Sequence, residues 1–238
     1  MPQRLRSWKA LALASVMVAG VSAGAKDNPQ RKAASSAIEK VTRNVAIVVW
    51  DGVELLDFAG PGEVFQAAGI IGAEGDKRLF NVYTVAKTRR PIVSQLFLTV
   101  VPQYTIKDCP VADIIVLPGG GTRSVKNDPE MIDWIKQSAD STEVFMSVCT
   151  GALLLAKAGL LDGLEATTWH GAIDLLKKEA PKAKVREKRR FVDNGKIVTT
   201  AGVSAGIDGA LHLVDRLHGR ALAKKTAKYM EYRWKPEE

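Results

Sequence analysis

The chain has 238 residues, of which 46% are hydrophobic and 25% are charged, and its formal net charge is +8. Such a chain can bury a substantial core, as a soluble globular protein does. The sequence has no C-x-x-C pair, no His pair at metal-ligand spacing and no G-x-x-x-x-G-K phosphate loop. We therefore expect neither a metal nor an organic cofactor.

The first 25 residues have the three parts of a signal peptide. Residues 1–9 carry basic side chains and no acid, residues 10–21 are apolar or small, and residues 22–25 offer a small-residue cleavage site. The apolar run is shorter than the roughly 20 residues that span a bilayer. An uncleaved anchor and a basic tail are the alternatives. We expect a periplasmic or secreted protein of about 213 residues that is free of the membrane after cleavage.

A polar segment at 26–43 predicts a linker or a loosely attached helix, and residues 44–238 are expected to form one domain. Apolar runs of strand length then alternate with segments of helical spacing. The expected elements are a strand at 44–50, a helix at 59–70, a strand at 79–86, a hairpin at 91–101, a strand at 113–117, a helix at 128–139, a strand at 144–148, a helix at 152–161, a strand at 196–200 and a helix that follows 201–206 and runs to 218. This alternation predicts an α/β fold with a mostly parallel sheet and helices on both faces, a flavodoxin-like three-layer sandwich.

Cys149 is the candidate nucleophile. It stands where the strand at 144–148 meets a small-residue turn and the helix at 152–161, which predicts a sharp strand–nucleophile–helix elbow. A helix N-terminus carries roughly half a positive charge, so we expect a lowered pKa for this thiol. A buried structural Cys is the alternative, because free Cys is among the most buried residue types.

Several segments resemble motifs of the ThiJ/PfpI superfamily, which has the class I glutamine-amidotransferase-like fold. They are residues 45–52, 54–61, 117–120, 147–151 and 201–208. The last three would lie at the carboxyl ends of strands, where ligands of parallel sheets bind. The L-D-x-x-G-P and S-V-C-T-G segments look most like the isonitrile hydratase branch, which also supplies sensor domains to some AraC-type regulators.

The resemblance implies a role for each matching residue. Cys149 would be the nucleophile, and Asp57 would be the acid near its sulfur, with capping of the following helix as the alternative role for Asp57. Gly119 and Gly120 would turn backbone N–H groups toward the nucleophile to stabilise a developing anion. Thr150 would supply a second N–H donor, and its hydroxyl a contact to the substrate.

One position departs from the family pattern. Several members have a His directly after a Thr-Thr pair, whereas here Thr167 and Thr168 are followed by Trp169 and then His170. A mechanism built on a Cys–His pair is therefore disfavoured. We interpret His170 as lining the pocket or capping a helix, with a catalytic base as the alternative. Gly202 would let its strand end line the same pocket.

The constellation favours an exported cysteine enzyme that acts on a small electrophilic carbon. Hydration of an isonitrile to an N-substituted formamide is its specific form, and a glyoxalase-like conversion of a 2-oxoaldehyde is the first alternative. A non-catalytic ligand-binding or redox-sensing module, with Cys149 forming a sulfenate, is the second. We expect a small-molecule substrate and no nucleic acid, because the roughly 20 residues after His218 are too few for a helix-turn-helix pair. The resemblance also implies a homodimer.

Cys109 is not expected to form an intramolecular disulfide with Cys149. It would precede one strand, while Cys149 follows a parallel neighbour, and a five-residue strand rises about 16 Å. A disulfide needs Cα atoms within roughly 7 Å.

The basic residues concentrated at 177–190 are expected to face solvent, with a patch for polyanions or a membrane surface as the alternative.

Overall fold

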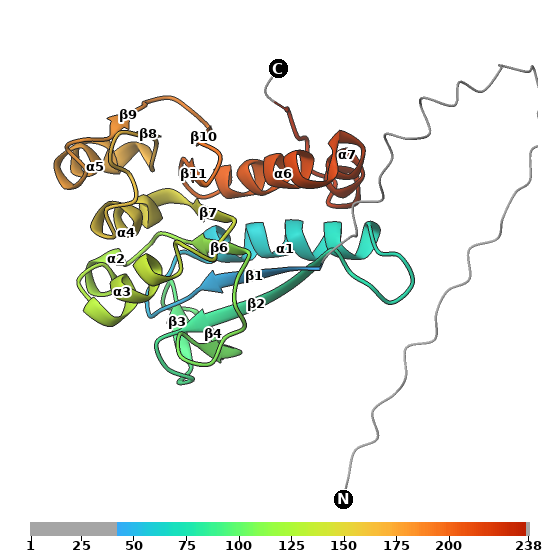
Figure 1. Cartoon of the computed structure of the whole chain (residues 1–238), viewed down its shortest axis with the longest axis horizontal. Coiled ribbons are helices and arrows are strands. Elements are labelled where there is room, and N and C mark those ends of the chain that lie inside the picture. The colour runs from blue at the N-terminus through green and yellow to red at the C-terminus, as the bar shows by residue number, and fades with distance from the viewer. Residues whose placement is uncertain (1–41, 237–238) are drawn as a thin grey trace, which may run out of the picture. The chain divides into compact units, whose positions relative to one another are not determined.

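A seven-stranded sheet with the order β10-β11-β7-β6-β1-β2-β5 lies at the centre of the computed structural model, which describes residues 42–236 (Figure 1). Every neighbouring pair is parallel except β10 with β11. The strands are β1 (Arg43–Val48), β2 (Phe80–Ala86), β5 (Tyr104–Thr105), β6 (Ile114–Leu117), β7 (Val144–Ser147), β10 (Phe191–Asp193) and β11 (Ile197–Thr200). The predicted mostly parallel α/β sheet is confirmed.

Helices form two groups on opposite faces of this sheet (Figure 1). One group packs α1 (Leu55–Ile71), α6 (Ala205–His218) and α7 (Arg220–Tyr229) against one another. In the other group, α4 (Ala152–Lys157) contacts α2 (Thr122–Val125), α3 (Pro129–Gln137) and α5 (Ile173–Glu179). None of the helices within residues 42–236 has the length and apolar character needed to cross a bilayer.

Short elements complete the structure between the larger ones. They are the antiparallel hairpin of β3 (Ile92–Ser94) and β4 (Leu98–Val100), the parallel pair of β8 (Glu165–Ala166) and β9 (Lys184–Val185), and the 3-10 turns at Cys149–Gly151 and His170–Ala172. The hairpin expected at 91–101 is confirmed. The signal peptide predicted at 1–25 and nearly all of the linker predicted at 26–43 lie outside the described residues, and β1 already includes Arg43.

Two helix boundaries differ from those expected. The helix predicted at 59–70 begins at Leu55, so Asp57 lies inside its first turn and Glu54 occupies the N-cap position. The capping role considered for Asp57 is therefore wrong. Pro61 lies inside the helix, where it has no N–H to donate to the carbonyl of Asp57 four residues earlier. The helix predicted at 152–161 stops at Lys157, because the backbone reaches a positive φ of 74° at Gly159.

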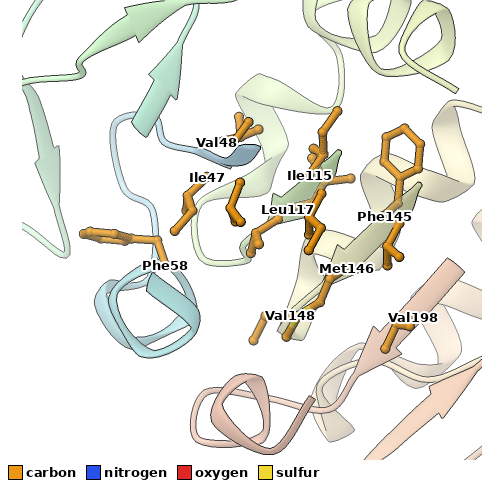
Figure 2. Packing of buried hydrophobic residues seen from close by; sticks show 14 of the residues in the cluster. Ile47, Val48, Phe58, Ile115, Leu117, Phe145, Met146, Val148 and Val198 are labelled. Carbon is orange, nitrogen blue, oxygen red and sulfur yellow. The ribbon is translucent and has the colours of Figure 1, made fainter. Parts of the chain in front are cut away.

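The central strands are buried on both faces, which explains their continuous apolar sequences. Side chains of neighbouring strands fill both faces, among them Ile47 on the face toward α1 and Phe145 on the other (Figure 2). Phe145 and Leu117 are fully buried, and Ile47 is nearly so. The carboxyl ends of these strands are consequently held rigidly, and the loops that leave them start from fixed positions.

The strand order reverses direction between β1 and β6. From β1 the chain pairs with β2 on one side, and it then crosses to β6 on the other side. Connections that leave the sheet in opposite directions open a crevice at the carboxyl ends of the two strands, which is where parallel α/β sheets bind ligands. Residues 118–120 leave β6 at this point, and α1 begins seven residues after β1 ends.

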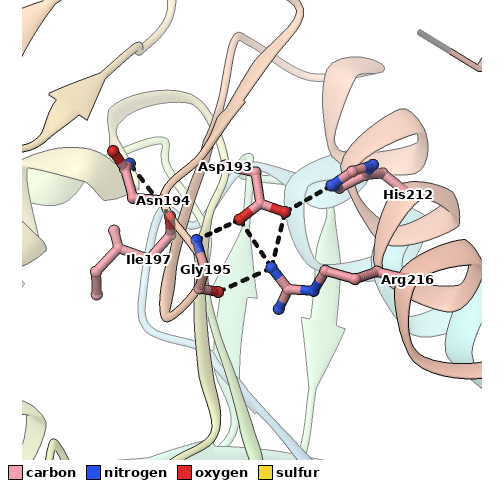
Figure 3. A network of polar contacts seen from close by, with 6 residues as sticks. All are labelled: Asp193, Asn194, Gly195, Ile197, His212 and Arg216. Carbon is pink, nitrogen blue, oxygen red and sulfur yellow. Dashed lines mark hydrogen bonds and ion pairs between the residues drawn. The ribbon is translucent and has the colours of Figure 1, made fainter. Parts of the chain in front are cut away.

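A polar network attaches the edge of the sheet to α6 (Figure 3). Both carboxyl oxygens of Asp193, on β10, accept hydrogen bonds of 2.7 Å from Arg216, and one lies 2.7 Å from the His212 ring. Arg216 also donates to the carbonyl oxygen of Gly195 at 2.8 Å. Because β10 and β11 form a hairpin that continues into α6, this network ties the turn of that hairpin to the second half of the helix.

Replacing Gly151 by Ala is expected to destabilise the fold by roughly 3 kcal/mol or more. An added Cβ at this position would lie 1.9 Å from the carbonyl oxygen of Leu117, so β6 or the turn after β7 must shift. Gly163→Ala is the matched control, because a Cβ there meets nothing within 4 Å and only the positive φ of 77° adds a cost of about 1–2 kcal/mol. Urea unfolding measures both, and a Gly151→Ala variant as stable as Gly163→Ala would contradict this packing.

Candidate active site

Cys149 occupies a strained turn directly after β7. Its φ of 56° lies in the left-handed region, which non-glycine residues adopt rarely. Its N–H donates to the carbonyl oxygen of Ala201 at 2.9 Å, so the ends of β7 and β11 are joined at this point. The absence of a side chain at Gly151 lets the turn approach the end of β6. The predicted nucleophile elbow at Cys149 is confirmed in its geometry.

Asp57 meets this elbow from the first turn of α1. The side chain is completely buried, and its Oδ2 accepts a hydrogen bond of 2.8 Å from the N–H of Gly119. The second oxygen, Oδ1, is buried and has no partner of regular hydrogen-bond geometry among residues 42–236. The Cys149 thiol interacts with this carboxyl and affects its pKa. A buried carboxyl oxygen without a regular partner is costly, and it is a group that a bound ligand would satisfy.

Two backbone N–H groups face the Cys149 sulfur. They belong to Thr150 and Val203, and both stabilise the ionised form of the thiol. Val203 reaches this position because its φ is 51°, another left-handed conformation for a branched side chain. The sequence analysis missed Val203, since a left-handed valine has no signature in the sequence. Its place directly after β11, in the 201–208 segment, was the available signal.

The N–H groups of Gly119 and Gly120 do not play the predicted role. That of Gly119 is bound to Asp57, and that of Gly120 donates to the Thr150 hydroxyl oxygen at 3.1 Å. The expectation that both glycines offer donors to a developing anion is therefore wrong in this structure. Glycine is required here for close approach: a Cβ on Gly119 would lie 2.6 Å from the Thr150 nitrogen, and one on Gly120 would lie 2.4 Å from that of Glu54.

Burial changes the protonation of both members of the pair. It raises the pKa of Asp57 from 3.8 to about 7, against the hydrogen bond from Gly119. Burial and the neighbouring Asp57 charge raise the pKa of Cys149 to about 12. The expected lowering of this thiol pKa is wrong, because the elbow continues into one 3-10 turn and a six-residue helix, whose N-terminal field does not offset burial beside a carboxylate. Above pH 7 the pair is a carboxylate next to a thiol.

Gly202 and His170 lie on a cleft of about 720 Å³ next to the elbow. Trp169 packs on Gly202, where a Cβ would fall 2.4 Å from the indole Cδ1, and the Trp169 and His170 rings are 4.8 Å apart. His170 is exposed and, among the described residues, makes no hydrogen bond to Cys149, which supports its interpretation as a cleft-lining residue. Thr168, which the sequence analysis did not single out, donates to the Cys149 carbonyl oxygen at 2.7 Å.

The remaining candidates lie away from the elbow. Cys109 and Cys149 are both free thiols. Within residues 42–236, no group of three or more His, Cys, Asp or Glu side chains is arranged to hold a metal ion. Several basic residues at 177–190 face water in ion pairs, as expected for a solvated surface, and the pairs are Lys177–Glu187, Lys182–Asp162 and Arg186–Glu165.

Comparisons with known proteins agree with this fold. The sequence profile of the DJ-1/PfpI family matches residues 43–216. An isonitrile hydratase from Pseudomonas putida is 34% identical over 189 residues, which make up 79% of this chain and 78% of that protein. The crystal structure of a ThiJ/PfpI family protein from Pseudomonas syringae superposes with a TM-score of 0.74 at 27% identity, covering 91% of this chain and 84% of that one.

Transcriptional regulators also contain a similar domain. The regulator GbdR of Pseudomonas aeruginosa is 23% identical over 190 residues, and the match covers 80% of this chain but only 51% of the regulator. The structure of an AraC family transcriptional regulator from Pseudomonas putida has a TM-score of 0.68 at 19% identity, with 79% of this chain and 99% of that one covered. At this identity the likeness shows the fold alone.

We expect Asp57→Asn to become more stable than the wild type as pH rises from about 4 to 7. Because the pKa of Asp57 is raised in the folded protein, protonation of this carboxyl stabilises the fold. This stabilisation is fully present below pH 3.8 and is lost as pH rises to about 7. A pKa moved from 3.8 to about 7 corresponds to about 4 kcal/mol, which the neutral Asn does not lose.

Urea unfolding of the two proteins at several pH values measures this difference. Asp140→Asn, on an exposed loop, removes the same charge without burial and serves as the control. A difference between Asp57→Asn and the wild type that stays constant from pH 4 to 8 would show that the Asp57 carboxyl has an ordinary pKa.

Proposed function

The chain belongs to the DJ-1/PfpI family, and on that premise we propose that it is a cysteine-dependent enzyme that hydrates isonitriles to N-substituted formamides. The observation that carries the proposal is the buried pair of Asp57 and Cys149, a proton acceptor in contact with a nucleophile. The 34% identity to an isonitrile hydratase supports the choice of reaction.

In the proposed first step, the Cys149 sulfur bonds to the terminal carbon of the isonitrile. A thiol with a pKa of about 12 is not ionised at neutral pH, so its proton must leave as the new bond forms. The Asp57 carboxylate accepts that proton and delivers it to the same carbon. The product is a thioimidate, R–N=CH–S–Cys149, and Asp57 is again a carboxylate. The overall step adds S–H across the isonitrile carbon without any oxidant.

Water completes the reaction in the second step. Its oxygen bonds to the thioimidate carbon while Asp57 accepts one of its protons and passes that proton to the nitrogen, which gives R–NH–CH(OH)–S–Cys149 and leaves Asp57 a carboxylate. The carbon–sulfur bond then breaks as the hydroxyl becomes a carbonyl. The proton of that hydroxyl passes through Asp57 to the sulfur, and the formamide R–NH–CHO leaves. The Thr150 and Val203 N–H groups stabilise the charge on the departing sulfur.

A ligand-binding or redox-sensing module is the second candidate function. The match to about half the length of a regulator supports its ligand-binding form. The raised pKa of the buried Cys149 thiol disfavours the redox-sensing form, because the exposed thiolate is the species that oxidises readily. Such a module would bind a small molecule at the elbow and form no product. Turnover therefore separates the two candidates directly.

Export and dimerisation stay predictions for this chain. Export rests on the three-part pattern of residues 1–25.

The exposed side chains of Leu96 and Phe97, at the tip of the β3–β4 hairpin, are 93% and 69% accessible and support a self-association surface. Glu54, which precedes α1 and therefore Asp57, contacts the same hairpin through Gln95 at 2.6 Å. A dimer formed there would lie next to the N-terminus of α1, the helix that carries Asp57.

We expect the purified protein to convert an isonitrile to its formamide with kcat/KM that rises with pH up to about 7 and then levels off. The rise follows Asp57, whose carboxylate form must accept the thiol proton. Cys149→Ala removes the activity, Asp57→Asn lowers kcat by roughly 10²–10⁴-fold, and Cys109→Ser leaves it unchanged. Formamide is quantified by chromatography. An isonitrile panel without product, with a 2-oxoaldehyde consumed instead, would overturn the assignment in favour of glyoxalase-like chemistry.

A further inference from the structure

The cleft of about 720 Å³ beside Cys149 is not explained by the chemistry at the sulfur. It lies between the 3-10 turn that begins at His170, the loop at 187–190 and the turn at 201–203. A cleft of this volume is in the range of sites for small organic molecules. The carbon and nitrogen of an isonitrile group would fill only a small part of it. The cleft therefore has room for the rest of a substrate.

One wall of the cleft is aromatic. Trp169 is 39% exposed although it is a large apolar side chain. Its ring is fixed from two sides, because a Cβ on either Gly202 or Gly171 would fall 2.4 Å from the indole. An exposed indole held in place in this way is a suitable surface for stacking a flat ring.

The loop at 187–190 brings three basic residues and one acid to the cleft. Lys177 offsets one of the two acids that line the cleft: it pairs with Glu187 at 2.8 Å and lies 3.7 Å from the exposed Asp174. Arg190 in turn is paired with Asp208. Lys188 and Arg189 are exposed and form no ion pair with any residue that the structure describes. Two cations on the rim of a small-molecule cleft favour an anionic group.

The cleft and the elbow share their walls. Ala201 accepts the N–H of Cys149, Thr168 donates to its carbonyl oxygen, and Val203 directs its N–H toward the sulfur. All three residues also line the cleft. The cleft thus adjoins the turn that holds the Cys149 sulfur.

We propose that this cleft selects isonitriles whose nitrogen carries an aromatic ring with a carboxylate, the ring stacking on Trp169 and the carboxylate meeting Lys188 and Arg189. The proposal rests on the proposed isonitrile hydration. Lys188 and Arg189 act on specificity alone, since neither contacts the reacting carbon. The expected effect is therefore on KM for anionic substrates, with kcat unchanged.

The test compares 4-isocyanobenzoate with its neutral methyl ester, which has the same ring and the same reactive carbon. We expect kcat/KM to be about tenfold higher for the acid, since two exposed ion pairs together contribute about that factor. In the Lys188→Ala/Arg189→Ala variant the preference disappears while the ester is hydrated as before. Lys224→Ala/Lys225→Ala, which removes two exposed charges from α7, retains the preference. Added salt weakens it in the wild type.

Calorimetric titration of the Cys149→Ala variant with 4-formamidobenzoate tests the cleft without turnover. Saturable binding that is weakened by Lys188→Ala/Arg189→Ala and by Trp169→Leu supports the cleft even if no isonitrile is hydrated, in which case the proposed function alone fails. Equal kcat/KM for acid and ester in the wild type, or loss of the preference in the α7 control, would overturn the cleft proposal while hydration itself stands.

Discussion

The contact between a buried carboxyl and a buried thiol is the constraint around which the other features of this site are arranged. Asp57 comes from α1 and Cys149 from the end of β7, and the N–H of Gly119, after β6, holds one carboxyl oxygen at 2.8 Å. Three separate segments thus meet where the strand order reverses. Burial disfavours ionisation of both groups, so the pair holds no more than one negative charge near neutral pH.

Keeping this contact requires conformations that the chain would not adopt alone. Cys149 and Val203 both have positive φ values, and such residues cost free energy that the surroundings must offset. The offset comes from the fully buried strands beneath the elbow and from the Asp193 network that ties the β10–β11 hairpin to α6. Packing far from the sulfur therefore decides the position of two groups that touch it. The same turn that presents Val203 to the sulfur forms a wall of the neighbouring cleft.

The sequence predicted the parallel sheet, the elbow at Cys149 and the segment that carries Asp57, because buried strands and small-residue turns leave a local pattern. It did not predict which donors reach the sulfur. Gly119 and Gly120 supply N–H groups at the right strand end, but Asp57 and Thr150 bind them, and that outcome depends on residues far apart in the chain. The apolar spacing predicts a helix from residue 59, whereas the folded chain extends it back to Leu55. The thiol pKa was misjudged because burial depends on the whole fold.

The most direct test of this account is the rate at which Cys149 is alkylated as a function of pH, in a Cys109→Ser background. The account predicts a rate that is still rising at pH 9, because burial and the Asp57 carboxylate raise the pKa of the thiol. With Asp57→Asn added, the curve shifts to lower pH, since the neighbouring negative charge is gone. A rate that levels off below pH 7 in the presence of Asp57, or that ignores the Asn substitution, would contradict a carboxylate–thiol pair.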